Sequence, residues 1–430
     1  MTDLFAARSQ MALSLGFHII FAAVGMSMPF LMAVSHWGWL KTKDPVYLKL
    51  TKAWSQGVAI LFAVGAVSGT ALSFELGLLW PKFMEPAGPI IGMPFSWEGT
   101  AFFIEAIFLG IFLYGWNRVP AYAHWLSGFI VGISGLASAF FVICANAWMN
   151  SPTGFDWVQG HAENIDPWKA MFNPMAWPQG LHMALASFTA TGFAVAGIHA
   201  LGLLKNPKKA LHRKAFRIAI LFASCSAILL PLQGDRLAKK LVLLQPVKFA
   251  AMEALYRTTT DAPLVLGGIP SDKDQTIRFG VEIPGLLSFL AHGDVQAEVQ
   301  GLDKTPLENR PPVAPTHLAF DLMAGIGTFL FMTSLFTLFA AWKRHQWLWD
   351  RRFLRLSVFC LPLGFLAIEA GWTVTEVGRQ PWIIYGILRT KDAVTSTPGL
   401  FYSMLVFTAL YLFLAFVVVW LMARRFRHVD

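Results

Sequence analysis

The sequence has 430 residues, of which 56% are hydrophobic and only 14% are charged. Its mean hydropathy of +0.54 excludes an ordinary soluble globular protein, and its length excludes a single membrane anchor. We therefore expect an all-α protein that crosses a membrane several times. The net charge of +9 says less about its partners than the distribution of the basic residues along the chain.

Long apolar runs set the expected architecture. A helix that crosses a bilayer needs about 20 mainly apolar residues. We expect no cleavable signal peptide, because the first apolar run is too long for a signal core. The sequence predicts nine crossings, near 11–35, 54–80, 94–116, 123–148, 180–204, 215–233, 317–342, 354–376 and 399–423.

One long polar segment interrupts the apolar runs. Residues 234–316 are rich in Pro, Lys and Asp, and we expect them to fold outside the membrane. This segment divides the chain into helices 1–6 in residues 1–233, an extracytoplasmic loop, and helices 7–9 in residues 317–430.

The basic residues predict the orientation. Lys and Arg concentrate in alternate connecting segments, at 41–52, 205–217, 343–355 and 424–427. Cytoplasmic segments of membrane proteins carry an excess of Lys and Arg. The pattern therefore places the C-terminus in the cytoplasm and the N-terminus, together with the long loop, outside.

In chain order, unusual residues fall in the outer half of several predicted helices. They are His18 in the first, Glu98 at the start of the third, His182 at the start of the fifth, Met323 early in the seventh, and Glu369–Arg379 at the end of the eighth. Independent helices are not expected to place such residues at one depth without a shared site. Two His, a Met and several Glu in a helix bundle suit haem iron better than zinc or calcium. Without a CxxCH pattern, such a haem is expected to be held non-covalently.

Other interpretations of these residues remain open at this point. A membrane His can be an interhelical hydrogen-bonding residue, and Met323 is one of 16 methionines, so packing alone can explain it. Glu98 and Glu105, seven apart on one helix face, need protons or partners. A secondary transporter that uses intramembrane Glu and His as a proton-coupled site is an alternative. A quinol-linked cytochrome that reduces another protein is a second alternative.

The sequence EAGWTVTEVGRQPW closes the eighth apolar run. Its Glu369 and Glu376 are seven apart and project from nearly the same helix face. Arg379 follows within reach of Glu376, and Trp372 precedes Glu376 by one turn. Intramembrane ionisable residues are functional candidates, although a helix end with snorkelling charges and an aromatic belt residue would look similar.

The string GWxxxExGRQPW resembles the signature of subunit I of the cytochrome bd-type quinol oxidases. Similar segments follow one another along essentially the whole chain, with matching crossings and loop position. Each motif is weak alone, but together they are specific. They are ALSLGFHIIF around His18, PFSWEGTAFFIEAIFLGIFLYGWNR with Glu98 and Glu105, ANAWMNSP after the fourth run, NPMAWPQGLHMALASF around His182, KFAAME from Lys248 to Glu253, and HLAFDLMAGIG with Met323.

The resemblance implies a set of iron ligands. His182 and Met323 would ligate a low-spin haem b, and His18 and Glu376 would ligate two separate high-spin haems. The resemblance does not say which of the two high-spin haems each holds. Expected cofactors are two haem b and one haem d, or haem b in place of haem d.

The resemblance also assigns the remaining polar residues. Glu98 and Glu105 would lie beside the high-spin haems as a second iron ligand or as proton donors, with Glu98 the named candidate for the ligand. Glu376 would take part in catalysis as a haem ligand. Arg379 and Trp372 would adjoin the cofactor. A positive charge such as that of Arg379 favours an ionised carboxylate ligand.

The implied activity is quinol oxidation at the outer loop, by Lys248 and Glu253, coupled to four-electron reduction of O2 to water with protons taken from the cytoplasm. The implied location is the cytoplasmic membrane of a bacterium. Expected partners are a homologous subunit II, membrane quinol and O2, with a very small accessory subunit allowed and no nucleic acid.

The sequence departs from the better-known members in two places. The loop lacks a long insertion, which indicates a short-loop form, and Asp321 stands two residues before Met323 where those members carry Arg. A carboxylate near a haem favours the ferric state, so the redox potential cannot be transferred. SFELGLLWP, residues 73–81, is similar to the cyanide-insensitive branch, in which haem d can be replaced by haem b.

Overall fold

The structure is a computed structural model that describes the backbone of residues 2–429 and the side chains of residues 2–424, so some of the basic residues near the C-terminus lie outside the described side chains. Within this part, nine helical segments are long and apolar enough to cross a membrane, which confirms the predicted all-α fold. They are Asp3–Thr42 (α1), Pro45–Leu79 (α2), Pro81–Tyr114 (α3), Ala121–Asn150 (α4), Ala176–Lys205 (α6), Ala210–Leu244 (α7), Val313–Lys343 (α10), Arg351–Phe359 (α11) with Leu363–Val377 (α12), and Leu400–Val429 (α14).

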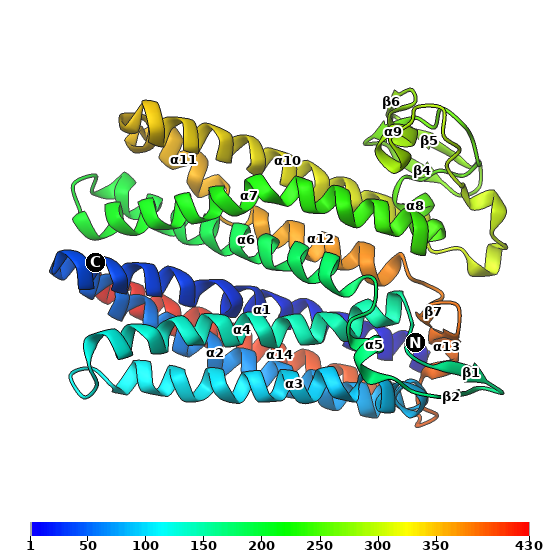
Figure 1. Ribbon diagram of the computed structural model, residues 1–430, viewed down its shortest axis with the longest axis horizontal. Coiled ribbons are helices and arrows are strands. Elements are labelled where there is room, and N and C mark those ends of the chain that lie inside the picture. Colours follow the sequence, from blue (N-terminus) through cyan, green and yellow to red (C-terminus); the bar gives the residue numbers. More distant parts are fainter. Residues whose placement is uncertain (1, 430) are drawn as a thin grey trace.

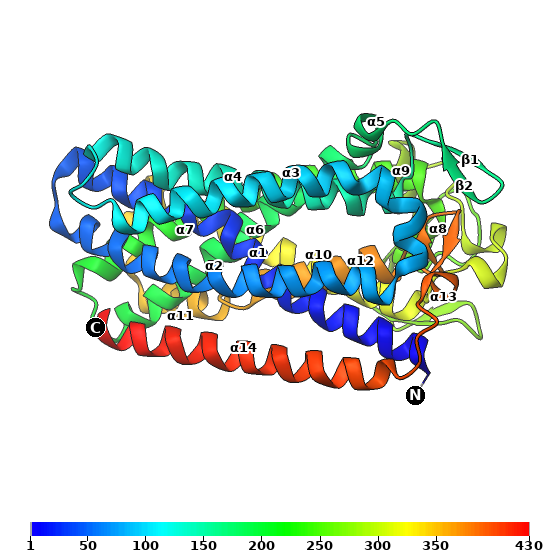
Figure 2. The same cartoon turned by 90° about the horizontal axis from the view of Figure 1, so that it is seen from below.

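The helices form two packed groups. Figure 1 shows α1 to α4 with α14 on one side, and α6, α7, α10, α11 and α12 on the other. Figure 2 shows α14 along the outside of the bundle, where it contacts α1 and α2. The groups meet where α1 and α4 contact α6 and where α1 contacts α12. The two chain termini lie at opposite ends of the bundle, as an odd number of crossings requires (Figure 1).

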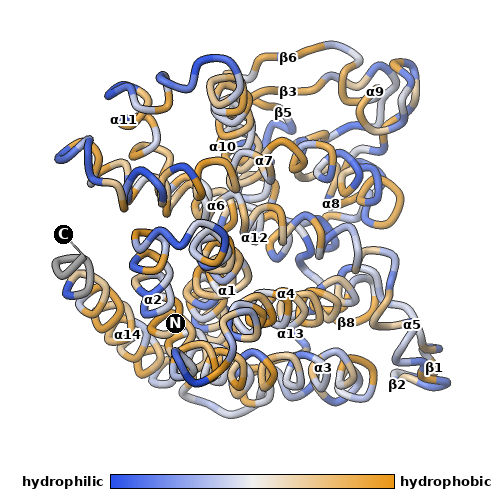
Figure 3. The backbone as a smooth tube through the Cα atoms, turned by 60° about the vertical axis from the view of Figure 1, so that its left-hand side comes forward, coloured by the Kyte–Doolittle hydropathy of each residue, from blue (hydrophilic) through white to orange (hydrophobic). Residues whose placement is uncertain are grey.

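Short elements cap the end of the bundle at which the N-terminus lies (Figure 1). All strand pairs there are two-stranded and antiparallel, including β3 with β6 and β4 with β5. The elements are β1 (Asp156–Val158), β2 (His161–Glu163), α5 (Pro167–Met171), α8 (Pro246–Met252), β3 (Leu264–Leu266), β4 (Ile269–Ser271), β5 (Thr276–Arg278), β6 (Val281–Ile283), α9 (Leu286–His292), β7 (Trp382–Ile384), β8 (Leu388–Arg389) and α13 (Thr390–Ala393). Figure 3 shows hydrophobic residues along the helices and hydrophilic ones in the connections.

Several helices extend well beyond their apolar runs. At 1.5 Å per residue the 40 residues of α1 span about 60 Å, so its ends pass the hydrocarbon core of a bilayer. Helix α7 continues to Leu244, past the expected end near residue 233, and an ion pair of 2.8 Å between Lys239 and Asp235 joins successive turns of this extension. The first part of the expected loop is therefore helical.

Two helix boundaries correct the expected depths. Helix α3 begins at Pro81 and continues through three prolines, which membrane helices tolerate, so Glu98 lies near its middle instead of at its start. Helix α1 begins at Asp3, so His18 is about 22 Å along its axis rather than the 10 Å expected from the apolar run. The eighth crossing breaks before α12, because Pro362 lacks the N–H that would continue α11.

Candidate functional site

His18 is oriented for metal binding by its second ring nitrogen. Its Nδ1 lies 2.9 Å from Ser68 Oγ, and Ser68 donates its own hydrogen to the Gly65 carbonyl. Nδ1 must therefore donate to Ser68, which leaves the lone pair on Nε2. A Cβ on Gly69 would lie 2.9 Å from His18 Cε1, so only glycine fits against the ring. This arrangement suits a haem ligand.

His182 and Met323 are also faced by glycines. A Cβ on Gly371 of α12 would lie 3.0 Å from Met323 Sδ, and one on Gly234 of α7 would lie 3.8 Å from His182 Cε1. The Nδ1 atom of His182 is buried and has no hydrogen-bond partner among the described residues. Each candidate ligand comes singly from its own helix, and a haem needs only one or two protein ligands.

Glu376, at the end of α12, accepts a hydrogen bond on each carboxylate oxygen. Asn146 Nδ2 on α4 donates to Oε1 at 2.6 Å, and Arg379 Nη2 donates to Oε2 at 2.5 Å. The expected proximity of Arg379 to Glu376 is therefore present, although the helix ends at Val377. The Arg379 side chain is 3% exposed and that of Glu376 is 27% exposed, so the ion pair is partly buried. The two donors fix the orientation of the Glu376 carboxylate.

Glu369 faces a different neighbour from Glu376. A Cβ on Gly16 of α1 would lie 3.3 Å from Glu369 Oε2, and Oε1 is buried without a hydrogen-bond partner in the described part of the chain. Trp372 packs against the cluster around Ile19 and Ile368, also between α1 and α12. The central part of α12 therefore faces α1, and its end faces α4.

Glu376, Glu98 and Glu105 contact α4 at three successive depths instead of one. Glu98 Oε1 lies 3.5 Å from Ser138 Oγ, and a Cβ on Gly135 would lie 3.2 Å from Glu105 Oε1. Ser138 is eight residues from Asn146, the partner of Glu376, which corresponds to about 12 Å along α4. Glu98 therefore lies deeper than Glu376, and Glu105 lies deeper still.

Lys248 and Glu253 are buried on α8 and its C-cap, outside the membrane-spanning helices. Lys248 is 2% exposed, and its Nζ donates to Asn150 Oδ1 at 2.5 Å and to the Thr375 carbonyl at 3.1 Å. Burial and the nearby Arg379 hold the pKa of Lys248 well below its ordinary value, against the opposing effect of Glu376. Within the described residues, no hydrogen bond or ion pair joins Lys248 to Glu253; their spacing of five had left direct pairing open.

Glu253 lies against the outer part of α10. Burial, together with the nearby Asp321 carboxylate, raises the pKa of Glu253 to about 8. The residue before it, Met252, accepts a hydrogen bond of 2.7 Å from His317 Nδ1 through its carbonyl. His317 Nε2 lies 3.4 Å from an Asp321 carboxylate oxygen. Asp321 therefore lies near both His317 and Glu253, and it is two residues from Met323 in sequence.

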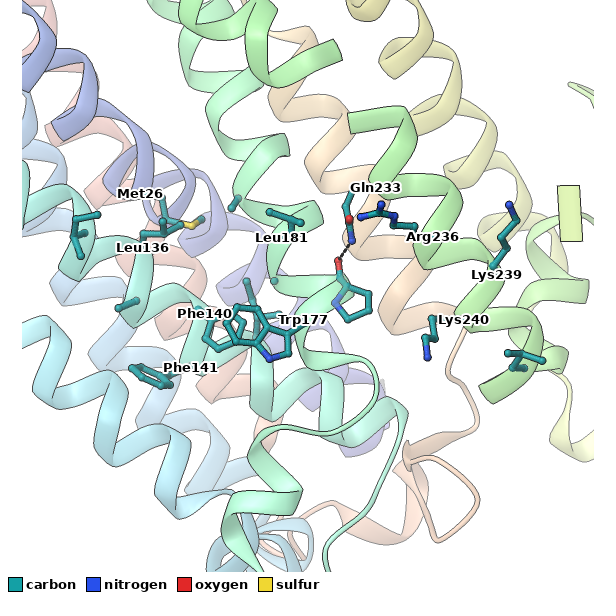
Figure 4. Close-up of a pocket in the computed structure, with 17 residues that line it drawn as sticks. Met26, Leu136, Phe140, Phe141, Trp177, Leu181, Gln233, Arg236, Lys239 and Lys240 are labelled. Carbon is teal, nitrogen blue, oxygen red and sulfur yellow. Dashed lines mark hydrogen bonds between the residues drawn. The ribbon is translucent and has the colours of Figure 1, made fainter. Parts of the chain in front are cut away.

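An apolar cavity of about 780 Å³ opens between α4, α6 and α7 (Figure 4). Phe140, Trp177 and Leu181 line its interior, and Arg236 and Lys240 of α7 lie at its edge. Its size and lining are typical of a site for an apolar small molecule.

Asn146, Asn150 and His317 lie in motifs recognised in the sequence, but the sequence indicated no role for any of them. Asn150 Nδ2 donates to the carbonyl and side-chain oxygens of Asn146, at 2.9 and 3.2 Å, and Gln179 Nε2 donates to Asn146 Oδ1 at 3.2 Å. The available signal was two amides four apart at the end of a membrane helix, where polar side chains usually bridge helices.

The chain is similar to known proteins over nearly its whole length. Residues 6–430 match the family model described as "Cytochrome bd terminal oxidase subunit I". The chain is 34% identical over 438 residues to a Bacillus subtilis protein assigned as a cytochrome bd menaquinol oxidase subunit I, covering 99% of this chain and 97% of that protein. It is 30% identical over 441 residues to the cytochrome bd ubiquinol oxidase subunit 1 of Bacillus subtilis, covering 99% and 94%. Its fold matches the bd oxidase of Geobacillus thermodenitrificans with a TM-score of 0.94 and 38% identity, covering 99% of this chain and 98% of that chain.

Proposed function

Because the chain belongs to the cytochrome bd terminal oxidase subunit I family, we propose that it oxidises quinol at its outer end and passes the electrons to buried haems that reduce oxygen to water. Terminal oxidase activity replaces both alternatives, the proton-coupled transporter and the cytochrome that reduces a protein. The chain is an integral membrane protein of a multi-subunit oxidase. The basic segments support a cytoplasmic C-terminus and an outer N-terminus in a bacterial cytoplasmic membrane.

The single observation that carries the cofactor proposal is the orientation of His18, whose Nδ1 donates to Ser68 and whose Nε2 therefore keeps a free lone pair for iron. We propose that His182 and Met323 hold the low-spin haem b, and that His18 and Glu376 hold the two high-spin haems, one of them haem d or a haem b in its place. When bound, these groups supply stepwise electron transfer and the activation of oxygen. The protein supplies the ligands, the spacing and the access for protons.

Lys248 and Glu253 support quinol oxidation at the outer end. Oxidation of a quinol to a quinone releases two electrons and two protons, so the site needs groups that accept protons near neutral pH. A buried Lys with a strongly lowered pKa and a buried Glu with a pKa of about 8 are both suited to that task. The cavity between α4, α6 and α7 suits the apolar part of a membrane quinol.

The relatives do not fix which quinol is used, because one is assigned to menaquinol and the other to ubiquinol. The experiment that tests the proposal is oxygen uptake by the purified complex with each reduced quinol. Uptake with one of them, lost in a double variant carrying Lys248→Ala and Glu253→Ala that keeps its haem, supports the proposed site. Normal quinol kinetics in that double variant would remove both residues from it.

Glu253 gives quinol oxidation a specific pH dependence. A carboxyl group with a pKa near 8 is only about one-tenth ionised at pH 7 and mostly ionised at pH 9. If the carboxylate accepts a quinol proton, kcat/KM for quinol should rise up to about tenfold over this range. Glu253→Gln should flatten the profile, whereas Glu282→Gln, at an exposed position of β6, should not. An unaltered profile in Glu253→Gln would contradict this role.

Glu98 and Glu105 of α3 support proton delivery from the cytoplasmic side. Both contact α4 farther from its outer end than Glu376 does. Glu105→Gln removes a titratable group but keeps the side-chain volume. It should slow oxygen reduction by about a hundredfold or more, the lower range for loss of a positioned proton donor, and leave haem content unchanged. Glu85→Gln, at an exposed position of the same helix, is the matched control. Turnover equal to that of the control would exclude Glu105 from the proton route.

The partner subunit is proposed from the least buried helices. The buried share of the apolar window is 17% in α2, 22% in α3, 22% in α10 and 11% in α14. In a membrane such faces contact lipid or another subunit. Three of these four helices belong to the group of α1 to α4 with α14, and we place the homologous subunit II against that group, with a very small accessory subunit allowed elsewhere.

A further inference from the structure

A continuous hydrogen-bonded path joins the proposed quinol side to the proposed haem side. Lys248 Nζ donates to Asn150 Oδ1 at 2.5 Å, Asn150 Nδ2 donates to Asn146 Oδ1 at 3.2 Å, and Asn146 Nδ2 donates to Glu376 Oε1 at 2.6 Å. The path crosses from α8 through two successive turns of α4 to the end of α12. Of its four residues, only Lys248 and Glu376, at the two ends, had an expected role from the sequence.

Every bond along the path donates in the same direction. Because Asn150 uses its oxygen to accept from Lys248, its amide nitrogen must face Asn146. Asn146 Oδ1 accepts from both Asn150 and Gln179, so its own nitrogen must face Glu376. Turning either amide over would set donor against donor and acceptor against acceptor. The orientation of one amide therefore fixes the orientation of the next.

We propose that Asn150 and Asn146 are positioning residues that transmit the occupancy of the quinol site to the haem ligand Glu376. This inference rests on the proposed roles of Lys248 and Glu376. A quinol or quinone that draws the Lys248 nitrogen away from Asn150 removes one of the three hydrogen bonds of the Asn150 side chain and leaves its two bonds to Asn146. With one bond fewer, the Asn150 amide shifts against Asn146, and the bond from Asn146 to Glu376 changes with it.

A purely structural role predicts a different behaviour. If the two amides only bind α4 to α12, replacing them would lower stability or haem retention but would not change how the haem responds to a quinone. The response of the high-spin haem spectrum to quinone binding is therefore the measurement that separates the two roles. Coupling between two sites is a difference in binding free energy and is visible only when both sites are observed.

The experiment uses the purified complex, a short-chain naphthoquinone and a short-chain benzoquinone as probes, and two readouts. One is the affinity for the quinone, and the other is the shift of the high-spin absorption band when the quinone binds. In the wild type we expect binding with a band shift. Asn146→Ala should keep the affinity within about twofold, because the bond from Lys248 to Asn150 remains, but should lose the shift. Asn150→Ala should lose the shift as well, and Asn164→Ala, on the exposed connection after β2, should change neither readout.

The outcomes separate failure of the path from failure of the quinol site. Binding without a shift in the wild type, or a shift that persists in both Asn146→Ala and Asn150→Ala, overturns the inference. If Lys248→Ala binds quinone as tightly as the wild type, the proposed quinol site is wrong and the inference falls with it. Should Asn146→Ala lose haem, Asn150→Ala decides, because Asn150 makes no hydrogen bond to Glu376 in the described structure.

Discussion

Replacing Glu376 with Ala should remove a high-spin haem and abolish oxygen reduction, while the low-spin band remains. The carboxylate is the proposed iron ligand, and nothing in alanine can replace it. The change also leaves the buried Arg379 without its anionic partner, which costs about 3–5 kcal/mol when one member of a buried pair is removed. Oxygen uptake measures the loss of oxygen reduction, and the reduced-minus-oxidised spectrum measures the loss of the high-spin haem.

The low-spin band serves as the internal control for folding in this variant. A bundle that still shows the low-spin band has kept its packing around the proposed ligands His182 and Met323, so loss of oxygen reduction would come from the site and not from misfolding. Glu376→Gln, which keeps the side-chain volume, should lose the same haem. If Glu376→Ala retained all three haems and full oxygen uptake, the assignment of this helix end would be wrong.

Replacing Met323 with Leu should change the low-spin haem and leave the high-spin bands in place. Leucine has a similar volume and so keeps the packing, but it offers no sulfur to the iron. We expect a lower midpoint potential, a conversion of the low-spin spectrum toward high spin, and slower electron transfer from quinol. Redox titration of the purified variant followed by its absorption spectrum measures these changes.

The same helix offers a matched control for this substitution. Met332 lies on α10 and is 56% exposed, so Met332→Leu should leave the spectrum and the midpoint potential as they are in the wild type. An unaltered low-spin band in Met323→Leu would remove Met323 from the ligands and leave His182 with a different partner.

The crossings were predictable because apolar runs of about 20 residues have few other uses in a chain. The helix ends were not. Pro86, Pro89 and Pro94 hide the continuity of α3, although helices in membranes accept proline. The four charged residues within 235–240 indicated the start of a loop, yet their helical spacing and the Asp235–Lys239 ion pair extend α7 to Leu244.

The candidate ligands were predictable by residue type and by family resemblance, but their arrangement was not. A sequence gives no relation between Asn146 and Glu376, which are 230 residues apart, or between Lys248 and Asn150, which are 98 apart. The expectation of one common depth failed for Glu98 because it rested on a helix start that the prolines obscured. Haem ligation itself, the type of the third haem and the cyanide-insensitive branch remain predictions.

The central claim is that four side chains of this one chain, His18, His182, Met323 and Glu376, hold three haems. The most direct test is the amount of total haem extracted from the purified complex per copy of this chain. We expect three haems, at least two of them haem b. Two or fewer haems per chain in active complex would contradict the ligand set.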